Sequence, residues 1–412
     1  ASNNTAVGGD ALAANTTGAS NVAVGTSALD ANTTGSNNVA VGESALSANT
    51  TALNNIGIGV ASLLTVTTGE NNIAIGTSSL RTNTASDNTA IGYNSLYANT
   101  TGTKNTAVGA LSLDATTTGN NNTSVGEQSL TTNTTGGNNT AVGTGALALN
   151  TTASNNTAVG YDALVANTTG TENTAMGANA LDANTTASYN SAFGVGSLGT
   201  NTTGANNTAV GHSSLFANTT GSENTAVGLS ALTANTTAAS NSAFGFKSLF
   251  TNTTGANNTG LGESTLRANT TGIDNVAVGW SALTANTTGG DNVAVGKQAL
   301  ISNTTASNNV AIGDRALQAN TTGTENVAVG KDAMYANTTS SRNTAIGLAA
   351  LDAQTTGSGY NTAVGNNALT TNTSGAYNTA IGANAITAIT TGSQNTAVGY
   401  AAGQGLTGAS NF

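Results

Sequence analysis

Apolar and polar residues alternate in a short segment that recurs along the whole chain. The segment reads Asn, then Thr or Val, then Ala, then Val or Ile, then Gly, as in residues 21–25. Its glycines follow one another every 17 residues, except that Gly76 to Gly92 spans 16 and Gly347 to Gly365 spans 18. The full unit is N-[TV]-A-[VI]-G-x-x-[AS]-L-x-A-N-T-T-G-x-x, and we number its positions one to seventeen. The 24 units account for essentially all 412 residues.

The period of the repeat selects the fold class. Helical repeats need about 33 to 47 residues and leucine-rich repeats about 20 to 29. The unit is rich in Gly, Asn and Thr and lacks Pro, which favours turns and short extended segments. We therefore expect an all-β fold, a β-solenoid of about 24 coils that forms one continuous array over 1–412. Stacking at about 4.8 Å would make it roughly 115 Å long. The two irregular spacings, at 83–86 and 356–360, should fall in corners.

Alternation within one coil predicts which positions face the core. Period-two alternation is expected to place positions two and four inside and position three outside. Position four is Val or Ile in 20 coils, which predicts a buried stack. Leu occupies position nine in 21 coils, and we expect it to point inward, with the small residue at position eleven, from a second short strand such as 28–31. Position ten varies freely and should face solvent.

Two kinds of residue recur so strictly that they predict structural columns. Gly fills position five in every coil, as a left-handed or very tight corner requires, and its predicted corner residues include Gly8, Gly25, Gly42, Gly76, Gly143, Gly211, Gly279 and Gly347. Asn fills position one in all 24 coils and position twelve in 19. Stacked amides can hydrogen-bond as ladders, and the predicted ladder includes Asn4, Asn21, Asn38, Asn72, Asn139 and Asn207.

Positions three and eight accept only small residues, although alternation would turn both outward. Position three is Ala, Gly or Ser, and position eight is Ala, Ser or Thr. A solvent-facing position normally varies, as position ten does. We therefore expect these columns to pack against a neighbouring copy of the same chain. The alternative is that they lie at crowded corners within one chain.

The five-residue core of the unit resembles that of a known family. Residues 72–76 read Asn-Ile-Ala-Ile-Gly and residues 309–313 read Asn-Val-Ala-Ile-Gly. These segments resemble the head repeats of trimeric autotransporter adhesins, the YadA-like left-handed β-roll, and the resemblance covers every unit. It implies a left-handed roll, a side-by-side homotrimer and a surface-exposed adhesive rod. The present unit is longer than the family's usual one, and the stalk, neck and membrane anchor have no counterpart. Trimeric phage tail fibres are further plausible carriers of such repeats.

Composition excludes several function classes. Charged residues are 6% of the chain, with one His, no Cys and a net charge of −10. We therefore expect no enzyme, no cofactor and no metal site; 18 acidic residues are too few for a calcium site in each of 24 coils. His212 is expected to be a surface residue at a corner. The net charge disfavours nucleic acid, and no apolar run of about 18 residues predicts a membrane span.

Aromatic residues at outward positions are the candidates for binding. Tyr93 and Tyr97 lie four residues apart, and Phe246 and Phe250 repeat this spacing. Such rings could stack on sugars or on a partner, although scattered surface aromatics are also normal. The candidate surface residues are Tyr93, Tyr97, Tyr161, Phe216, Phe246, Phe250 and Trp280.

These observations favour a non-enzymatic extracellular fibre, structural or adhesive, at a cell or virion surface. The expected partner is the chain itself, as a trimer and with possible head-to-tail stacking into a filament. The adhesion target, whether host surface, matrix or glycan, stays open. One alternative is the shaft of a phage tail fibre. An ice-binding solenoid is less favoured because adjacent threonines at positions thirteen and fourteen turn only one side chain outward. The Asn-Thr-Thr sequons would carry glycans only in a suitable secretory host.

Overall fold

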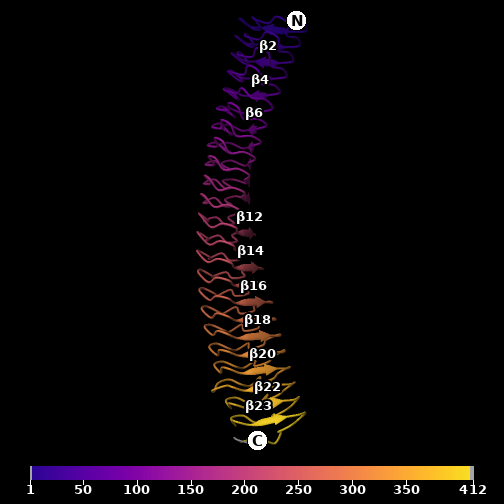
Figure 1. Cartoon of the computed structure of the whole chain (residues 1–412), viewed down its shortest axis with the longest axis vertical. Coiled ribbons are helices and arrows are strands. Elements are labelled where there is room, and N and C mark those ends of the chain that lie inside the picture. The colour runs from indigo at the N-terminus through magenta and orange to yellow at the C-terminus, as the bar shows by residue number, and fades with distance from the viewer. Residues whose placement is uncertain (1, 409–412) are drawn as a thin grey trace. The chain divides into compact units, whose positions relative to one another are not determined.

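The computed structural model describes residues 2–408, which fall into two compact units that divide between Asn206 and Asn207. Each unit is a parallel β-solenoid with a repeat of about 17 residues, and no helix occurs among the described residues. Within each unit successive coils stack with their strands on the same side (Figure 1). The all-β solenoid architecture predicted from the repeat is therefore confirmed.

Each described coil contributes one strand of three residues. In the first unit these are β1 (Thr5–Val7), β2 (Val22–Val24), β3 (Val39–Val41), β4 (Ile56–Ile58), β5 (Ile73–Ile75), β6 (Thr89–Ile91), β7 (Thr106–Val108), β8 (Thr123–Val125), β9 (Thr140–Val142), β10 (Thr157–Val159), β11 (Thr174–Met176) and β12 (Ser191–Phe193). In the second unit they are β13 (Thr208–Val210), β14 (Thr225–Val227), β15 (Ser242–Phe244), β16 (Thr259–Leu261), β17 (Val276–Val278), β18 (Val293–Val295), β19 (Val310–Ile312), β20 (Val327–Val329), β21 (Thr344–Ile346), β22 (Thr362–Val364), β23 (Thr379–Ile381) and β24 (Thr396–Val398).

Neighbouring strands within a unit pair in parallel with identical positions opposite one another. Val22 of β2 lies opposite Val39 of β3, for example. The pairing keeps this register across both irregular spacings, where Ile73 pairs with Thr89 and Thr344 pairs with Thr362. The missing and added residues lie in the bends before β6 and β22, as predicted. A corner can therefore lose or gain one residue without shifting the sheet.

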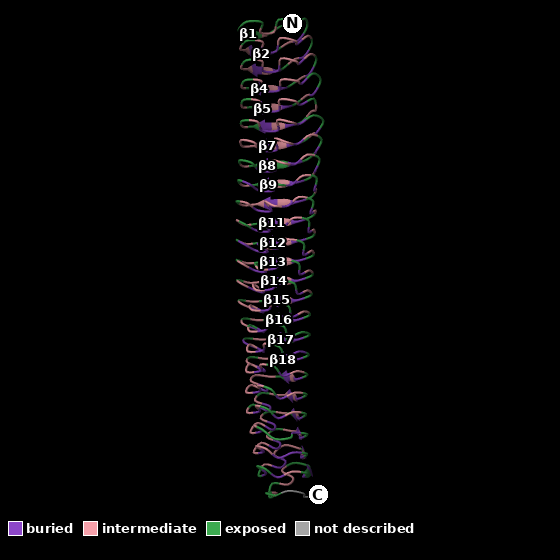
Figure 2. Cartoon of the chain, turned by 90° about the vertical axis from the view of Figure 1, so that its left-hand side faces the viewer, coloured by how far each residue is buried: buried purple, intermediate pink, exposed green. Residues whose placement is uncertain are grey.

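The strand turns its small residue, not its large ones, toward the interior. Ala23 is fully buried, whereas Val22 and Val24 on either side are half-exposed. Figure 2 shows this burial pattern repeating from coil to coil. The prediction that positions two and four face the core was wrong, because alternation fixes opposite faces but not which face is inside. The interior has room for little more: a Cβ built on Gly57, also at position three, would lie 3.3 Å from Leu46 Cγ.

Position eight also faces inward, contrary to prediction. Ala28 and Leu29, at positions eight and nine, are both fully buried. Positions three and eight share one space, since a Cβ on Gly260 would lie 2.8 Å from Thr265 Oγ1 in the same coil. Where position eight grows to Thr, position three shrinks to Gly. The small residues thus reflect crowding within one chain, and they are not an interface with a neighbouring copy.

The expected second strand is instead a pair of tight turns. Ser27 and Leu29 have φ of 54° and 50°, in the left-handed region. The Ala28 N–H donates back to Gly25 O (3.3 Å), and the Leu29 N–H donates onward to Ala45 O in the next coil (3.1 Å). A non-glycine residue in this region costs about 1–2 kcal/mol. Full burial of Leu, worth about 1.5–3 kcal/mol, offsets that cost and so accounts for leucine at position nine.

The glycine at position five sits in a conformation that other residues rarely adopt. Across the coils its φ lies between +121° and +142°. A Cβ on Gly25 would lie 2.5 Å from Gly42 O in the next coil. The eight predicted corner residues Gly8, Gly25, Gly42, Gly76, Gly143, Gly211, Gly279 and Gly347 all have this geometry. Each corner therefore excludes a side chain both by backbone conformation and by the packing of its neighbour.

Candidate functional site

The asparagines at position one form a buried column that links successive coils. The backbone N–H of Asn38 donates to Asn21 Oδ1 (2.9 Å), and Asn38 Nδ2 donates to Ala52 O (2.9 Å). Of the predicted members Asn4, Asn21, Asn38, Asn72, Asn139 and Asn207, all but the half-buried Asn4 are fully buried. Their amides are used within the chain, so this column has a structural role and presents no ligand group at the surface.

A second amide column runs through position twelve. Asn49 Nδ2 donates to Asn32 Oδ1 in the preceding coil (2.9 Å) and to Ala52 O in its own coil (3.4 Å). The carbonyl at position fifteen thus accepts from both columns. Among the Asn-Thr-Thr sequons of this column, Asn15 in the first coil is half-buried, whereas the asparagines of later coils, such as Asn32 and Asn167, are fully buried. A glycan attached there would displace the ladder.

Interruptions of the second column leave an identifiable defect. Position twelve holds Val66, Thr116, Gln354, Ile389 and Leu406 in five described coils. Four buried asparagine oxygens have no hydrogen-bond partner, namely Oδ1 of Asn49, Asn99, Asn337 and Asn372. Each belongs to the coil directly before an interruption. Where the residue of the next coil does not donate to it, the asparagine oxygen is left unsatisfied; Gln354, for example, donates to Thr356 O instead of to Asn337 Oδ1.

The outward face of the sheet is an apolar surface along each unit. Position four carries Val, Ile, Leu, Met or Phe in every coil, and position two carries Val, Ile, Thr or Ser. The side chains at position four are half-exposed or exposed, with Ile58 at 37% and Leu261 at 49%. No charged residue occurs at either position. All 18 acidic and 8 basic residues instead lie at positions six, seven, ten, sixteen and seventeen. We call positions two and four together the sheet face.

The candidate aromatic residues lie on the turn that follows the strand. Tyr93, Tyr161, Phe216, Phe246 and Trp280 are exposed, whereas Tyr97 and Phe250 are half-buried. Tyr360 and Tyr377, which are not among the candidate residues, form a stacked pair of rings.

Several of these rings pair with a cation that the sequence analysis did not associate with them. Arg81 donates to the Tyr97 hydroxyl (3.1 Å) with its guanidinium carbon 5.7 Å from the ring centre. Lys247 Nζ lies 5.1 Å from the centre of Phe246. The signal was present, because the cation in each case stands next to the ring in sequence or in the same column one coil away. At Tyr161 the neighbour is anionic, and a hydrogen bond with Asp162 raises the pKa of this phenol.

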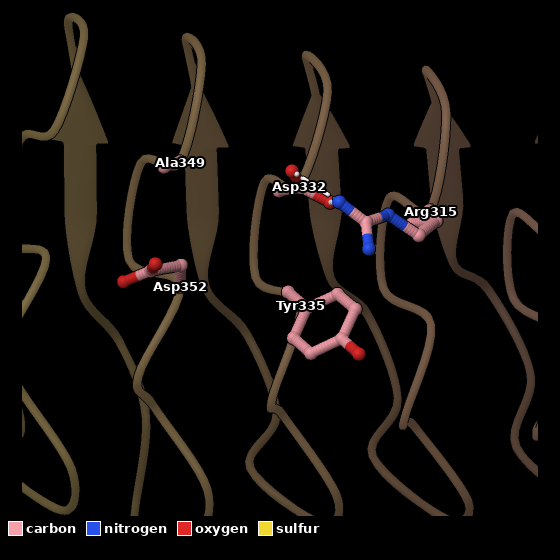
Figure 3. A pocket seen from close by; sticks show the side chains of 5 residues that line it. All are labelled: Arg315, Asp332, Tyr335, Ala349 and Asp352. Atoms are coloured by element: carbon pink, nitrogen blue, oxygen red, sulfur yellow. Dashed lines mark hydrogen bonds and ion pairs between the residues drawn. The ribbon is translucent and has the colours of Figure 1, made fainter.

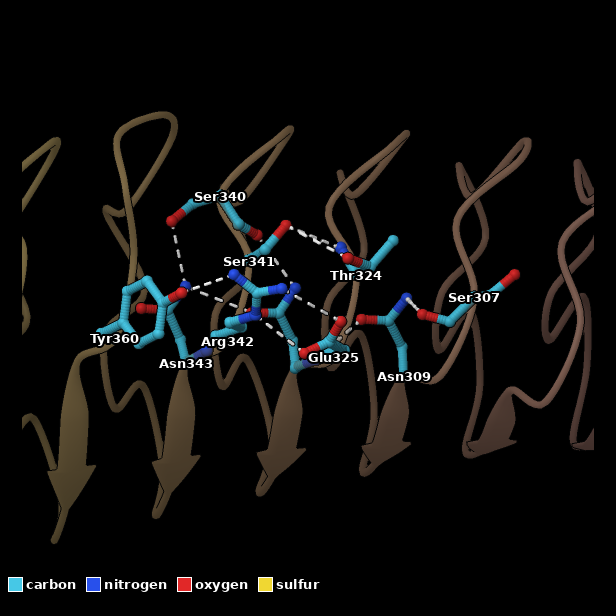
Figure 4. A network of polar contacts seen from close by, with 10 residues as sticks. Ser307, Asn309, Thr324, Glu325, Ser340, Ser341, Arg342, Asn343 and Tyr360 are labelled. Atoms are coloured by element: carbon cyan, nitrogen blue, oxygen red, sulfur yellow. Dashed lines mark hydrogen bonds and ion pairs between the residues drawn. The ribbon is translucent and has the colours of Figure 1, made fainter.

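A polar network runs along position seventeen of the second unit (Figure 4). Arg342 Nε donates to Glu325 Oε2 (2.8 Å), and Arg342 Nη1 donates to the Tyr360 hydroxyl. Tyr360 in turn stacks on Tyr377, with ring centres 5.0 Å apart and planes 7° from parallel. The hydrogen bond from Arg342 lowers the pKa of Glu325, and the same contact raises the pKa of Arg342. The column ties four successive coils together on the surface.

A small pocket of about 300 Å³ opens on the turns that follow the strands of the second unit (Figure 3). It is lined by Arg315, Asp332, Tyr335, Ala349 and Asp352. Arg315 Nη2 lies 2.8 Å from Asp332 Oδ1, and its guanidinium carbon lies 5.3 Å from the centre of Tyr335. The cation that could act on a ligand is thus already paired with a carboxylate.

Two further carboxylates at position ten are perturbed by their surroundings. Burial raises the pKa of Asp114, although its hydrogen bond from Thr131 Oγ1 (2.6 Å) acts in the opposite direction. Burial likewise raises the pKa of Asp182. Both lie in the first unit, and no basic group contributes to the pKa shift of either. These groups affect stability with pH rather than forming a reactive pair.

Other chemical groupings are sparse. His212 is exposed and its Nδ1 lies 3.0 Å from Ser213 Oγ, without a carboxylate to form a catalytic set. Among residues 2–408, no three His, Cys, Asp or Glu side chains gather where they could hold a metal ion. The same part of the chain contains no helix of the length and apolarity that a membrane crossing needs.

Comparison with known proteins adds no relative. No family model matches this chain, and no curated protein matches it either. The likeness to adhesin head repeats therefore depends on the five-residue motif and on the solenoid architecture.

Proposed function

We propose that the chain is the shaft of an extracellular structural or adhesive fibre, in which copies pack side by side through the sheet face. The single observation that carries this proposal is the unbroken run of uncharged, mostly aliphatic residues on the outside of the sheet. Monomeric proteins rarely expose continuous apolar patches above a few hundred Å². The chain places every charge elsewhere, which keeps this face free of the repulsion that would oppose contact between identical copies.

Three copies are the proposed number, and the handedness is proposed to be left. Both follow from the resemblance to the heads of trimeric autotransporter adhesins and not from the charge pattern. A fibre of a virion would use the same shaft, so the proposal covers a cell or virion surface. The contact differs from the one expected from the sequence, since Ala23 at position three belongs to the core and Val24 at position four to the sheet face.

The test is the mass of the chain in solution and its response to charge on the sheet face. Sedimentation equilibrium should give three times the chain mass of 39.8 kDa. Val159→Lys together with Val295→Lys should yield monomers that keep the far-ultraviolet circular dichroism of the parent. As a matched control, Val60→Lys and Val195→Lys at the exposed position six should still assemble. A wild-type chain that sediments as a monomer at all concentrations rules the shaft proposal out.

An ice-binding surface is a second candidate with one observation in its favour. Threonine at position fourteen is exposed in most coils and forms a regular column, as at Thr34 and Thr51. The hydroxyl of the threonine at position thirteen is already used, since Thr33 Oγ1 donates to Thr50 O (3.1 Å). One free hydroxyl column is narrower than the paired columns expected of such a surface. Thermal hysteresis of the purified chain distinguishes the candidates, because a fibre shaft predicts none.

A further inference from the structure

Cations and aromatic rings gather on one turn of the second unit. Positions six, seven and ten of four successive coils, 241–308, place there six residues that we call the basic–aromatic patch: Phe246, Lys247, Phe250, Arg267, Trp280 and Lys297. These positions hold three cations and a single carboxylate, Glu263. The patch is thus locally cationic on a chain whose net charge is −10.

The lysines of the patch are not neutralised by carboxylates. The ion pairs found within residues 2–408 are Arg315 with Asp332 and Arg342 with Glu325, and neither involves the patch. Lys247 Nζ instead lies 5.1 Å and 5.5 Å from the centres of the Phe246 and Phe250 rings. Cation–π attraction at an exposed site is modest, about 0.5–1 kcal/mol. It positions the ammonium group beside the ring and leaves it able to bind an anion.

Trp280, two coils beyond Phe246, and Lys297 in the coil after it form a second pair of ring and cation. Lys297 Nζ lies 5.6 Å from the centre of Trp280. Trp280 and Phe246 are 46% and 42% exposed, so both rings are accessible. Each site therefore offers an aromatic ring with an ammonium group at its side.

The solenoid fixes the distance between these two sites. The Ser264 N–H donates to Phe246 O (2.9 Å), and the Gln298 N–H donates to Trp280 O (2.9 Å). The backbone of each aromatic residue is thus hydrogen-bonded to the next coil. Phe246 and Trp280 occupy position six two coils apart, which separates their backbones by about 10 Å. A ligand that spans both sites must be extended and must present flat apolar faces with acidic groups at intervals.

We propose that the basic–aromatic patch binds an acidic glycan. Sugar rings lie on Phe246 and Trp280, and the carboxylates of the glycan are bound by Lys247 and Lys297. The exposed rings can stack on the apolar face of a sugar, and the cations favour acidic sugars over neutral ones. Nucleic acid would meet the same groups, but its dense phosphate charge is repelled by the strongly acidic remainder of the chain. The proposal rests on the adhesive function proposed above, for which it names the target class.

The single tryptophan of the chain makes the binding measurable without a label, because Trp280 lies in the patch. A uronate hexasaccharide prepared from hyaluronate should change tryptophan fluorescence saturably, and added salt should weaken its binding. The uncharged cellohexaose should bind at least tenfold more weakly. Lys247→Gln combined with Lys297→Gln should also lower uronate affinity by about tenfold or more, equivalent to 1.4 kcal/mol. Lys104→Gln, in the first unit, is the matched control and should bind as the parent does.

Three results would overturn the proposal: no saturable response to the uronate, equal binding of cellohexaose, or tighter binding of a twelve-nucleotide oligothymidylate. Unchanged affinity in the double lysine variant would do so as well. Circular dichroism checks that this variant is folded. Sedimentation of the parent separates the two proposals, because uronate binding by a monomeric chain retains the glycan site and rejects the shaft.

Discussion

The unsatisfied amide oxygens at the ladder interruptions predict a stabilising substitution. In the structure Val66 replaces the asparagine of position twelve, and Asn49 Oδ1 in the preceding coil is left without a donor. In Val66→Asn, the new Nδ2 would reach Asn49 Oδ1 and Gly69 O, as its counterparts do in other coils. The new Oδ1 would accept from Asn83 Nδ2, which now donates to Ala85 O.

The expected gain follows from the balance of three contributions. Satisfying a buried acceptor recovers about 1–3 kcal/mol, and each further hydrogen bond adds about 1 kcal/mol. Removing the fully buried valine from its apolar contacts costs about 1.5–3 kcal/mol. Asparagine is slightly smaller than valine, so overpacking is not expected. The net change is a stabilisation of about 1–2 kcal/mol.

Local hydrogen exchange is the suitable assay because stacked coils need not unfold in a single step. Peptides covering 60–75 are followed by mass spectrometry in the parent and in Val66→Asn. A gain of about 1.4 kcal/mol lowers the rate of exchange through local opening about tenfold. Peptides several coils away should exchange at unchanged rates, since each coil contacts only its neighbours.

The reverse substitution in an intact part of the ladder provides the control. Asn150 Nδ2 donates to Asn133 Oδ1 (2.9 Å) and to Ala153 O (3.0 Å). Asn150→Val removes these two bonds and the one that Asn150 Oδ1 accepts from Asn167 Nδ2 (3.1 Å). It creates the same orphan oxygen at Asn133, so exchange there should accelerate by a similar factor. If Val66→Asn accelerates exchange as Asn150→Val does, apolar burial outweighs the ladder and the reasoning fails.

Three further predictions concern the corners and the surface. Gly42→Ala places a Cβ 2.6 Å from the next coil's carbonyl oxygen at φ +133° and should lower Tm by several degrees, whereas Gly9→Ala, with open space around it, should not. Burial raises the pKa of Asp182, so its contribution to stability is greatest below its unfolded pKa and is lost as pH rises through its folded pKa. Asp182→Asn should therefore raise Tm at neutral pH more than at about pH 3, and more than the exposed Asp274→Asn does; equal shifts at both pH values would contradict this. In a glycosylating secretory host, folded protein should carry glycan at the exposed sequon of Asn121 and none at the buried position-twelve asparagines. Enzymatic release of the glycans in heavy-oxygen water, followed by mass spectrometry, maps the occupied sites.

The repeat was sufficient to predict the solenoid, its period and its strand register, because a residue that recurs every coil must occupy one column. The orientation of the strand was not predictable in the same way. Ala23 and Val24 alternate under either orientation, and hydrophobicity alone favoured burying valine. The deciding fact is the width of the interior, which Leu29 and the two asparagine columns already fill. That width depends on the left-handed backbone conformation at positions seven and nine. The sequence pattern did not predict this conformation, because leucine rarely adopts it.

For the candidate surface residues, too, the sequence predicted one property, their exposure, but not another, their contacts with cations. Their exposure followed from variability, since a position that accepts both Phe246 and Glu263 cannot be in the core. The cation beside a ring was missed because Trp280 and Lys297 are 17 residues apart and meet only through coil stacking. The prediction that positions three and eight form an interface was wrong for a related reason, because small residues such as Ala141 indicated close contact but not that the contact was inside the chain.

The asparagine column of the second unit also has an electrical direction. From Asn218 to Asn337 each Nδ2 donates to Oδ1 of the coil before it, over seven consecutive bonds. The amide dipoles of this column are therefore aligned and can polarise one another. Along each strand the backbone groups point alternately to the next and the preceding coil, as in the hydrogen bonds from the Val22 N–H to Asn38 O and from the Gly25 N–H to Val7 O. Their dipoles therefore largely cancel along the stacking direction, whereas the asparagine column contributes a net dipole. A substitution such as Asn269→Val would divide that dipole into two shorter ones.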